Sequence, residues 1–369
     1  MGRRLTLLVM GAVLVTTTSV VAIASGGLAE AIGFVPTLLQ PLTIAYTDWQ
    51  GIKTSMGVPW LTSQAAIDVR IAFAQRLTQD HAAASAYALS RLSAHADMWG
   101  FDTTDLEWEV QITANGIPPS YLLKLREGFD FAPLVARFEE RGFSRTELYG
   151  EAVFSRGVDP SLDWLRTTEL SIHNTAWLEE ERLLILSSSF PVVELLLATA
   201  AGGFARLSDD AAAKALAAHL AEPLAAYLLF GGSTCLRFSP NPLLDLIGTP
   251  VGESALEDLR AWLDSGDPLF AYEALGVAYR HDEQRPVGAI AFVYADAVDA
   301  EHDLEPRRLL AEFGTCARWE APIAETCFVL EDAWVEETAI LFTVRPVNDQ
   351  PRRLLQMVLY ADAPFAACR

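Results

Sequence analysis

Cysteines are the side chains whose number and spacing predict chemistry most directly. The chain holds four: Cys235, Cys316, Cys327 and Cys368. None has the close spacing that a zinc site or a redox-active Cys-x-x-Cys pair requires. An even number of widely spaced cysteines favours disulfides in an oxidising compartment. Of the three pairings that four cysteines allow, we predict Cys316–Cys327 together with Cys235–Cys368; four free, buried thiols are the alternative.

Histidine and serine patterns do not predict a catalytic centre. No two of the six histidines stand at metal-ligand spacing: His81, His95, His173, His219, His281 and His302. The run Gly231-Gly232-Ser233-Thr234-Cys235 lacks the second glycine of a nucleophile elbow, so we interpret it as a turn. Ser187-Ser188-Ser189 precedes a helix that opens at Pro191, where it favours N-capping over anion binding.

Carboxylates gather once in a pattern that could bind calcium. Asp296, Asp299, Glu301 and Asp303 are closely spaced oxygen donors, but the turn glycine of an EF-hand loop is missing. We therefore interpret them as a solvated loop and a helix cap. No glycine-rich run has the lysine of a phosphate-binding loop. The sequence assigns no catalytic residue, no metal ligand and no cofactor.

Composition narrows the class of partner. Apolar residues make up 51% and charged residues 20% of 369 positions, enough for a large hydrophobic core. The formal net charge of -21 repels nucleic acid and anionic lipid headgroups. Nucleic-acid binding is thereby excluded as a function. We interpret the excess of acidic residues as a solvated surface; the alternative is that they bind a cation or a cationic ligand.

The N-terminus predicts export. Arg3 and Arg4 precede an apolar stretch, and Ala22-Ile23-Ala24 before Ser25 is typical of a signal-peptide cleavage site. The uncharged run 5–24 is also long enough to span a bilayer if it stays uncut. Residues 1–24 are therefore either a signal peptide or an N-terminal membrane anchor. The mature protein would be bacterial and extracytoplasmic, secreted or held to the membrane only by this segment.

Strand periodicity is clearest over residues 106–112. Leu106, Trp108, Val110 and Ile112 alternate with polar residues, which predicts that they face the core while Glu107 and Glu109 face solvent. An Asn-Gly turn follows, and a second alternating run completes a hairpin. Further strands are predicted at 42–48, 148–155, 170–178, 183–188, 225–230, 273–280, 287–295, 326–330, 339–344 and 354–360.

Two helices are predicted to start in the same way. Asp130 and Asp303 each follow a hairpin, and each stands three residues before a proline in an apolar-rich segment. This predicts two strand-strand-helix-strand units and an internal duplication. The alternative is the general preference of proline for a first helical turn. Other helices are predicted over 63–96, 191–201 and 208–221.

These elements predict the α+β class, with antiparallel sheets that carry helices on one face, in two lobes. Residues 25–41 are predicted to be a linker and 42–239 the first α+β lobe. Residues 240–267 form the connecting segment, and 268–369 the second α+β lobe.

Several short segments resemble a known group of exported proteins. Val35-Pro36 leads to Ala45-Tyr46-Thr47-Asp48, and residues 185–189 lead to Pro191-Val192-Val193. Ser208-Asp209-Asp210 then opens a helix that runs on to Ala225-Ala226-Tyr227-Leu228. In this order they resemble uncharacterised bacterial proteins of the DUF3352 type, a domain of unknown function, over about half the chain. The resemblance implies a location and an architecture, but no activity and no site residue.

The sequence thus favours a non-catalytic envelope protein that binds a ligand or an envelope protein. A secreted hydrolase with a triad from distant residues is the first alternative, and a purely structural or assembly protein is the second. A closed apolar cavity would favour a carrier, whereas a pocket that joins Ser, His and an acid would favour a hydrolase.

Overall fold

The computed structural model describes residues 27–156 except 88, 90 and 91, and residues 173–238 except 233. It also describes residues 262 and 265, and residues 267–368 except 283, 284, 317 and 320. The predicted leader and most of the connecting segment lie outside these residues. Within them, no helix combines the length and apolar composition needed to cross a bilayer.

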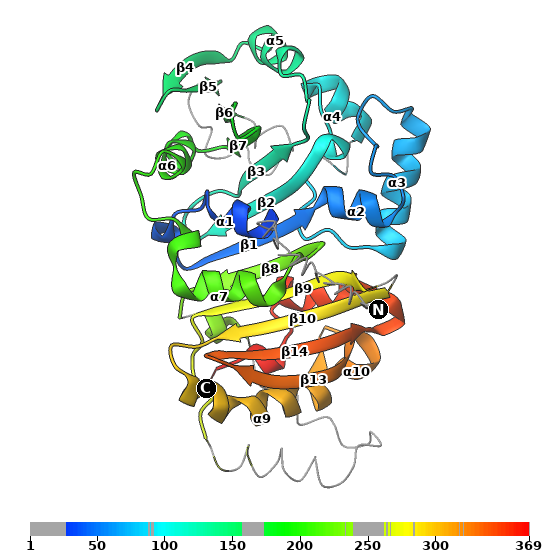
Figure 1. The fold of residues 1–369 in the computed structure, drawn as a ribbon, viewed down its shortest axis with the longest axis vertical. Coiled ribbons are helices and arrows are strands. Elements are labelled where there is room, and N and C mark those ends of the chain that lie inside the picture. The colour runs from blue at the N-terminus through cyan, green and yellow to red at the C-terminus, as the bar shows by residue number, and fades with distance from the viewer. Residues whose placement is uncertain are drawn as a thin grey trace, which may run out of the picture.

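One antiparallel sheet of twelve strands forms the frame of the molecule, in the order β13-β14-β10-β9-β8-β1-β2-β3-β7-β6-β5-β4 (Figure 1). Its strands are β1 (Leu42–Asp48), β2 (Leu106–Ala114), β3 (Ser120–Leu125), β4 (Ser144–Leu148), β5 (Glu151–Ser155), β6 (Asn174–Leu178), β7 (Leu183–Ser187), β8 (Ala225–Phe230), β9 (Ala274–Asp282), β10 (Arg285–Val293), β13 (Phe328–Glu336) and β14 (Ala339–Pro346). A separate short pair joins β11 (Thr315–Cys316) to β12 (Ala321–Pro322).

Helices cover both faces of the sheet. They are α1 (Gly27–Ile32), α2 (Trp49–Ser55), α3 (Ile67–Asp80), α4 (Leu92–Trp99), α5 (Ala132–Glu140), α6 (Phe190–Ala200), α7 (Ala211–Leu220), α9 (Ala297–Phe313), α10 (Ile323–Thr326) and α11 (Pro351–Leu359). The core on one face includes α1, α6 and α7, and the core on the other includes α2 to α5, α9 and α11. Figure 1 shows α7 crossing β9 and β10 on the near face. The α+β class is confirmed, but the expectation of separate sheets with helices on one face is wrong.

The two predicted lobes share this sheet. Strand β8 of the first pairs with β9 of the second, from Ala225↔Tyr279 to Phe230↔Ala274. The segment 25–41 is not a free linker from Gly27 on. Leu28, Ala31 and Val35 are buried, and Leu207 donates its backbone N–H to the Val35 carbonyl over 2.7 Å. The apolar side chains of this segment are therefore part of the hydrophobic core.

Several predicted elements differ from the structure. The predicted helix over 63–96 is broken between α3 and α4 by the segment 81–87, which lies on the sheet. Side chains from four strands hold that segment through hydrogen bonds: Thr47, Glu109, Tyr227 and Tyr279. The predicted strand 354–360 is instead part of α11, because Leu354, Leu355 and Val358 have helical spacing behind Pro351 in the first turn.

The predicted cap at Asp303 is also wrong. Helix α9 begins at Ala297, and Asp296 caps it by accepting the backbone N–H of Asp299 over 3.0 Å. Asp303 lies inside the helix, and Pro306 does too. In the first half, α5 begins at Ala132, where Asp130 accepts the Ala132 N–H over 3.0 Å. The two helix starts therefore differ, and the shared motif no longer supports an internal duplication.

The register of β2 is correct on one face only. Trp108, Val110 and Ile112 are buried as predicted; Leu106 is buried in the opposite core, because the pairing with β3 shifts between Leu106 and Trp108. Glu109 was predicted to face solvent, yet its side chain is fully buried. Since helices cover both faces here, the polar positions of an alternating strand are enclosed as well.

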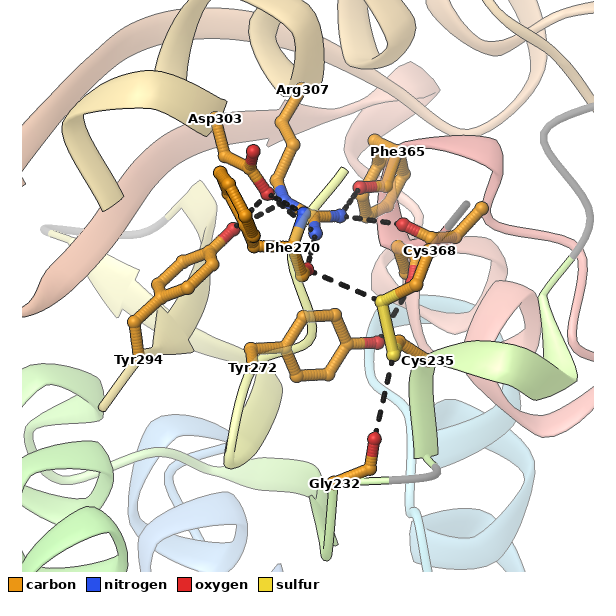
Figure 2. The surroundings of a disulfide bond; sticks show 11 residues. Gly232, Cys235, Phe270, Tyr272, Tyr294, Asp303, Arg307, Phe365 and Cys368 are labelled. Atoms are coloured by element: carbon orange, nitrogen blue, oxygen red, sulfur yellow. Dashed lines mark hydrogen bonds and ion pairs between the residues drawn. A yellow bond between two sulfur atoms is a disulfide. The ribbon is translucent and has the colours of Figure 1, made fainter. Parts of the chain in front are cut away.

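Hydrogen bonds from the buried Arg307 hold the C-terminal segment in place next to the disulfide of Cys235 and Cys368 (Figure 2). Cys235 and Cys368 are bonded, with Cα atoms 5.3 Å apart, as predicted. The fully buried Arg307 donates to the carbonyls of Phe365 and Ala367, over 2.7 and 3.0 Å, and to Asp303 over 3.1 Å. The disulfide indicates an oxidising, extracytoplasmic compartment.

Candidate functional site

An open cleft of about 820 Å³ lies where three strand ends meet. Neighbouring antiparallel strands run in opposite directions, so the end of β1, the start of β8 and the end of β9 lie at one edge of the sheet. Helix α2 leaves this edge and α7 arrives at it. The cleft is lined by Asp48, Gln50, Gly51, Thr54, Ser55, Ala221, Glu222, Leu224, Arg280 and His281.

Asp48 forms one wall where β1 turns into α2. Its side chain caps α2 by accepting the Gly51 N–H over 2.7 Å. Burial raises the pKa of Asp48, against the hydrogen bond from the Gly51 backbone, which lowers it. A Cβ at position 51 would lie 2.5 Å from Asp48 Oδ2 and 2.8 Å from a Leu224 methyl, so a larger residue there would displace one of these side chains. The wall is therefore closely fitted.

The opposite wall carries backbone strain. After α7 ends, Ala221 and Glu222 have φ angles of 33° and 47°, in the left-handed region that non-glycine residues avoid. The chain is held there by Leu224, whose N–H donates to the Tyr279 carbonyl over 2.9 Å. Strained residues persist only when surrounding structure fixes them, and they are concentrated at functional sites.

His281, which lines the cleft, stacks against His81, a buried residue that is not part of the lining. The rings of His81 and His281 have centroids 4.6 Å apart and planes at 17°. His81 Nδ1 and His281 Nε2 are buried and have no hydrogen-bond partner among the described residues. Burial lowers the pKa of His81 to about 4, with His281 as a further cause, and burial lowers the pKa of His281 too. Both rings are therefore neutral at pH 7.

Ser55 contacts this histidine pair. Its Oγ lies 3.3 Å from His81 Nε2, but it also donates a hydrogen bond to the Ile52 carbonyl over 2.8 Å. The serine proton is thus directed at a backbone oxygen rather than at the histidine. No described carboxylate accepts a hydrogen bond from His81 Nδ1. The acid that orients the imidazole in the relay of a serine hydrolase therefore has no counterpart at His81 among the described residues.

Three charged side chains line the cleft. Asp48, Glu222 and Arg280 all line it, and none forms an ion pair with a residue that the structure describes. Hydroxyl and amide groups stand beside them in Thr54, Ser55 and Gln50. The cleft can therefore offer both signs of charge and several hydrogen bonds to a small polar molecule.

A second, smaller hollow of about 160 Å³ lies beside α7. It is bounded by His219 and Leu220 of that helix and by Ala289 and Trp334 of the sheet. It is too small to hold a lipid chain of the kind that exported carriers enclose.

The carboxylates considered for calcium are spread over α9 and its cap. Asp296 is the N-cap, while the Asp303 carboxylate is buried and bound to Arg307 and to the Tyr294 hydroxyl. Among the residues that the structure describes, no three His, Cys, Asp or Glu side chains are arranged to hold a metal ion.

The serines considered as nucleophile or cap fall elsewhere. Ser233 lies outside the described residues. Ser189 is the N-cap residue of α6, but its side chain makes no capping hydrogen bond; Ser187 Oγ instead accepts the Ser189 N–H over 3.1 Å. The pair of His81 and His281 carries no local signal in the sequence, because these distant positions meet only where the segment 81–87 is hydrogen-bonded to Tyr279 of β9.

The second predicted cysteine pair is close but not bonded. Cys316 and Cys327 are buried thiols whose Sγ atoms lie 3.1 Å apart.

Comparison with known proteins gives little likeness. No protein-family model and no curated protein matches the chain. Two crystal forms of TP0453 are similar in structure, with a TM-score of 0.39 each. Form I is 8% identical over 90% of this chain and 97% of that one, and form III is 9% identical over 89% and 96%.

Proposed function

We propose that this protein is a non-catalytic, extracytoplasmic binding protein whose ligand is a small polar molecule held in the cleft at the ends of β1, β8 and β9. The single observation that carries the proposal is that Glu222 and Arg280, two side chains of opposite charge, line a cleft of about 820 Å³ and form no ion pair with a residue that the structure describes. A ligand with both a cationic and an anionic group would pair with them. The neutral His281 and the hydroxyls of Thr54 and Ser55 supply further hydrogen bonds.

Export through residues 1–24 belongs to the same proposal. The disulfide between Cys235 and Cys368 supports an oxidising compartment, which is where such a leader would deliver the chain. The segment then serves either as a cleaved signal peptide or as an anchor. An envelope protein is the alternative binding partner to the small molecule.

The experiment is native mass spectrometry of the ectodomain purified from the cell that exports it. We expect a bound small molecule in the wild type that is lost from Arg280→Ala and from Glu222→Gln. The matched control is Arg285→Ala, an exposed arginine of β10 outside the cleft. An adduct that survives both cleft substitutions, or a wild-type protein with none, would contradict the proposal.

A hydrolase is the second candidate, and the contact between Ser55 Oγ and His81 Nε2 is the observation in its favour. The bond from Ser55 to the Ile52 carbonyl and the missing acid argue against it. A fluorophosphonate probe that labels Ser55 in the wild type, and not in His81→Phe, would establish the hydrolase instead of the binding protein.

A further inference from the structure

Two thiols meet inside the second half of the chain. Cys316 is the last residue of β11, and Cys327 follows α10 as its C-cap. Their Sγ atoms are 3.1 Å apart, and neither side chain is exposed. No other cysteine competes for them among the described residues, because Cys235 and Cys368 are already bonded to each other.

Backbone hydrogen bonds hold both positions. Cys327 donates its N–H to the Ile323 carbonyl over 2.8 Å and accepts the Val347 N–H over 3.0 Å. Cys316 pairs with Ala321 in the short β11–β12 ladder. The two sulfurs are therefore brought together by structure on both sides.

We infer that Cys316 and Cys327 are joined by a second disulfide in the exported protein. The thiolate of one of the two cysteines attacks a disulfide of an oxidising partner, releases one thiol of that partner and forms a mixed disulfide. The thiolate of the other cysteine then displaces the partner's second thiol. Two protein thiols are oxidised, one partner disulfide is reduced to two thiols, and the two protons go to the released thiolates.

Burial decides when this reaction takes place. Since both sulfurs are fully enclosed, an oxidant reaches them before the core of the second half closes, and not afterwards. The bond then closes the loop that contains β12 and α10. In the same loop Arg318 donates its N–H to Asp362 over 3.0 Å, so the bond restrains this contact with the segment that follows α11.

The test is peptide mapping of the full chain purified from an oxidising compartment. Free thiols are alkylated in denaturant without reductant, and trypsin then cuts after Arg318, between the two cysteines. We expect a linked Cys316–Cys327 peptide pair that has lost two hydrogen atoms, with neither cysteine alkylated. The Cys316→Ser variant serves as the control, and there Cys327 should become alkylated while the Cys235–Cys368 peptides stay linked.

The Cys235–Cys368 bond provides an internal standard for oxidation. Alkylated Cys316 and Cys327 in a sample where Cys235 and Cys368 are linked would overturn the inference. A cross-pairing of Cys235 with Cys316 or Cys327 would overturn it too. A Cys316→Ala, Cys327→Ala double variant should melt several degrees lower than the oxidised wild type. When the Cys235–Cys368 bond is removed from both proteins, reductant should lower the melting temperature of the one that keeps Cys316 and Cys327 and leave that of the double variant unchanged.

Discussion

Trp49 donates its indole N–H to the Glu109 carboxylate over 3.0 Å, and neither side chain reaches solvent. The same carboxylate accepts the Tyr87 N–H over 2.7 Å and the Ser85 hydroxyl. One acid from β2 thereby joins α2 to the segment 81–87, which begins with His81, the residue stacked against His281. Burial raises the pKa of Glu109, against the three donors, which lower it.

Replacing Glu109 with Gln should therefore lower the free energy of unfolding by about 1–3 kcal/mol, because the amide turns a donor toward groups that are donors themselves. The adjacent Glu107→Gln is the matched control. Its carboxylate pairs with Arg182 over 2.9 Å and is 29% exposed, so its loss should cost about 0–1 kcal/mol. Urea unfolding measures both, and equal effects would contradict the buried role of Glu109.

Acid should weaken the fold through His81. Its pKa in the folded protein is about 4, below the ordinary 6.5, so the folded state prefers the neutral ring. Above pH 6.5 the ring is neutral in both states and costs no stability. As the pH falls from 6.5 toward 4, the unfolded state takes up the proton and the folded state does not, so the free energy of unfolding decreases. His81→Phe keeps a ring against His281 but cannot take up a proton, so its urea midpoint should fall less steeply over that window.

Tyr149→Phe, an exposed ring at the β4–β5 turn, controls for the substitution itself. A His81→Phe profile that parallels the wild type would show that the acid limb has another origin. His95 is the first place to look, since burial lowers its pKa to about 4 as well.

Arg307→Lys should loosen the C-terminal segment. Lysine keeps the charge but cannot reach the carbonyls of Phe270, Phe365 and Ala367 together, as the planar guanidinium does. We expect a loss of about 2–4 kcal/mol and faster amide exchange in residues 363–368. Its neighbour Arg308 pairs with Glu305 and Glu312 on the surface, so Arg308→Lys should cost no more than about 1 kcal/mol.

Cys368→Ser should remove the bond to Cys235, which spans 133 residues. A loop of that length predicts a loss of about 4–5 kcal/mol if the effect is chain entropy. Unfolding with and without reductant measures it. The wild type should lose stability on reduction, whereas the variant should lose only what any second disulfide contributes.

Fractionation with N-terminal sequencing tests the leader. We expect the chain outside the cytoplasm, beginning at Ser25 if the leader is cut or held in the membrane with Met1 if it is not. A cytoplasmic protein that begins at Met1 would refute export.

Prediction from the sequence succeeded where the residues of an element determine its secondary structure by themselves. Strand β1 occupies residues 42–48 as expected, because its apolar and β-branched residues form strand whichever sheet they join. The long helix over 63–96 failed for a tertiary reason: hydrogen bonds from Tyr227 and Tyr279, on strands far along the chain, hold the segment 81–87 in a non-helical path.

Glu109 shows the limit of periodicity. Alternation shows which residues share a face of the sheet, but it does not show whether the second face is exposed to solvent. That exposure depends on which helices, formed elsewhere in the sequence, cover the face. The cleft escaped prediction for the same reason, since Asp48, Glu222 and His281 come from three separate parts of the chain. By contrast, α11 carried a readable signal in Pro351, which is typical of a first helical turn.

The place of β1 in the sheet has a consequence for the order of events during synthesis. The first strand to emerge from the ribosome lies between β2, which follows soon after, and β8, which comes much later. Until β8 is made, one side of β1 exposes unpaired backbone groups on an apolar strand, a template for pairing with other chains. In the nascent chain this side of β1 therefore stays open to pairing with other chains for as long as the stretch between β2 and β8 takes to be translated.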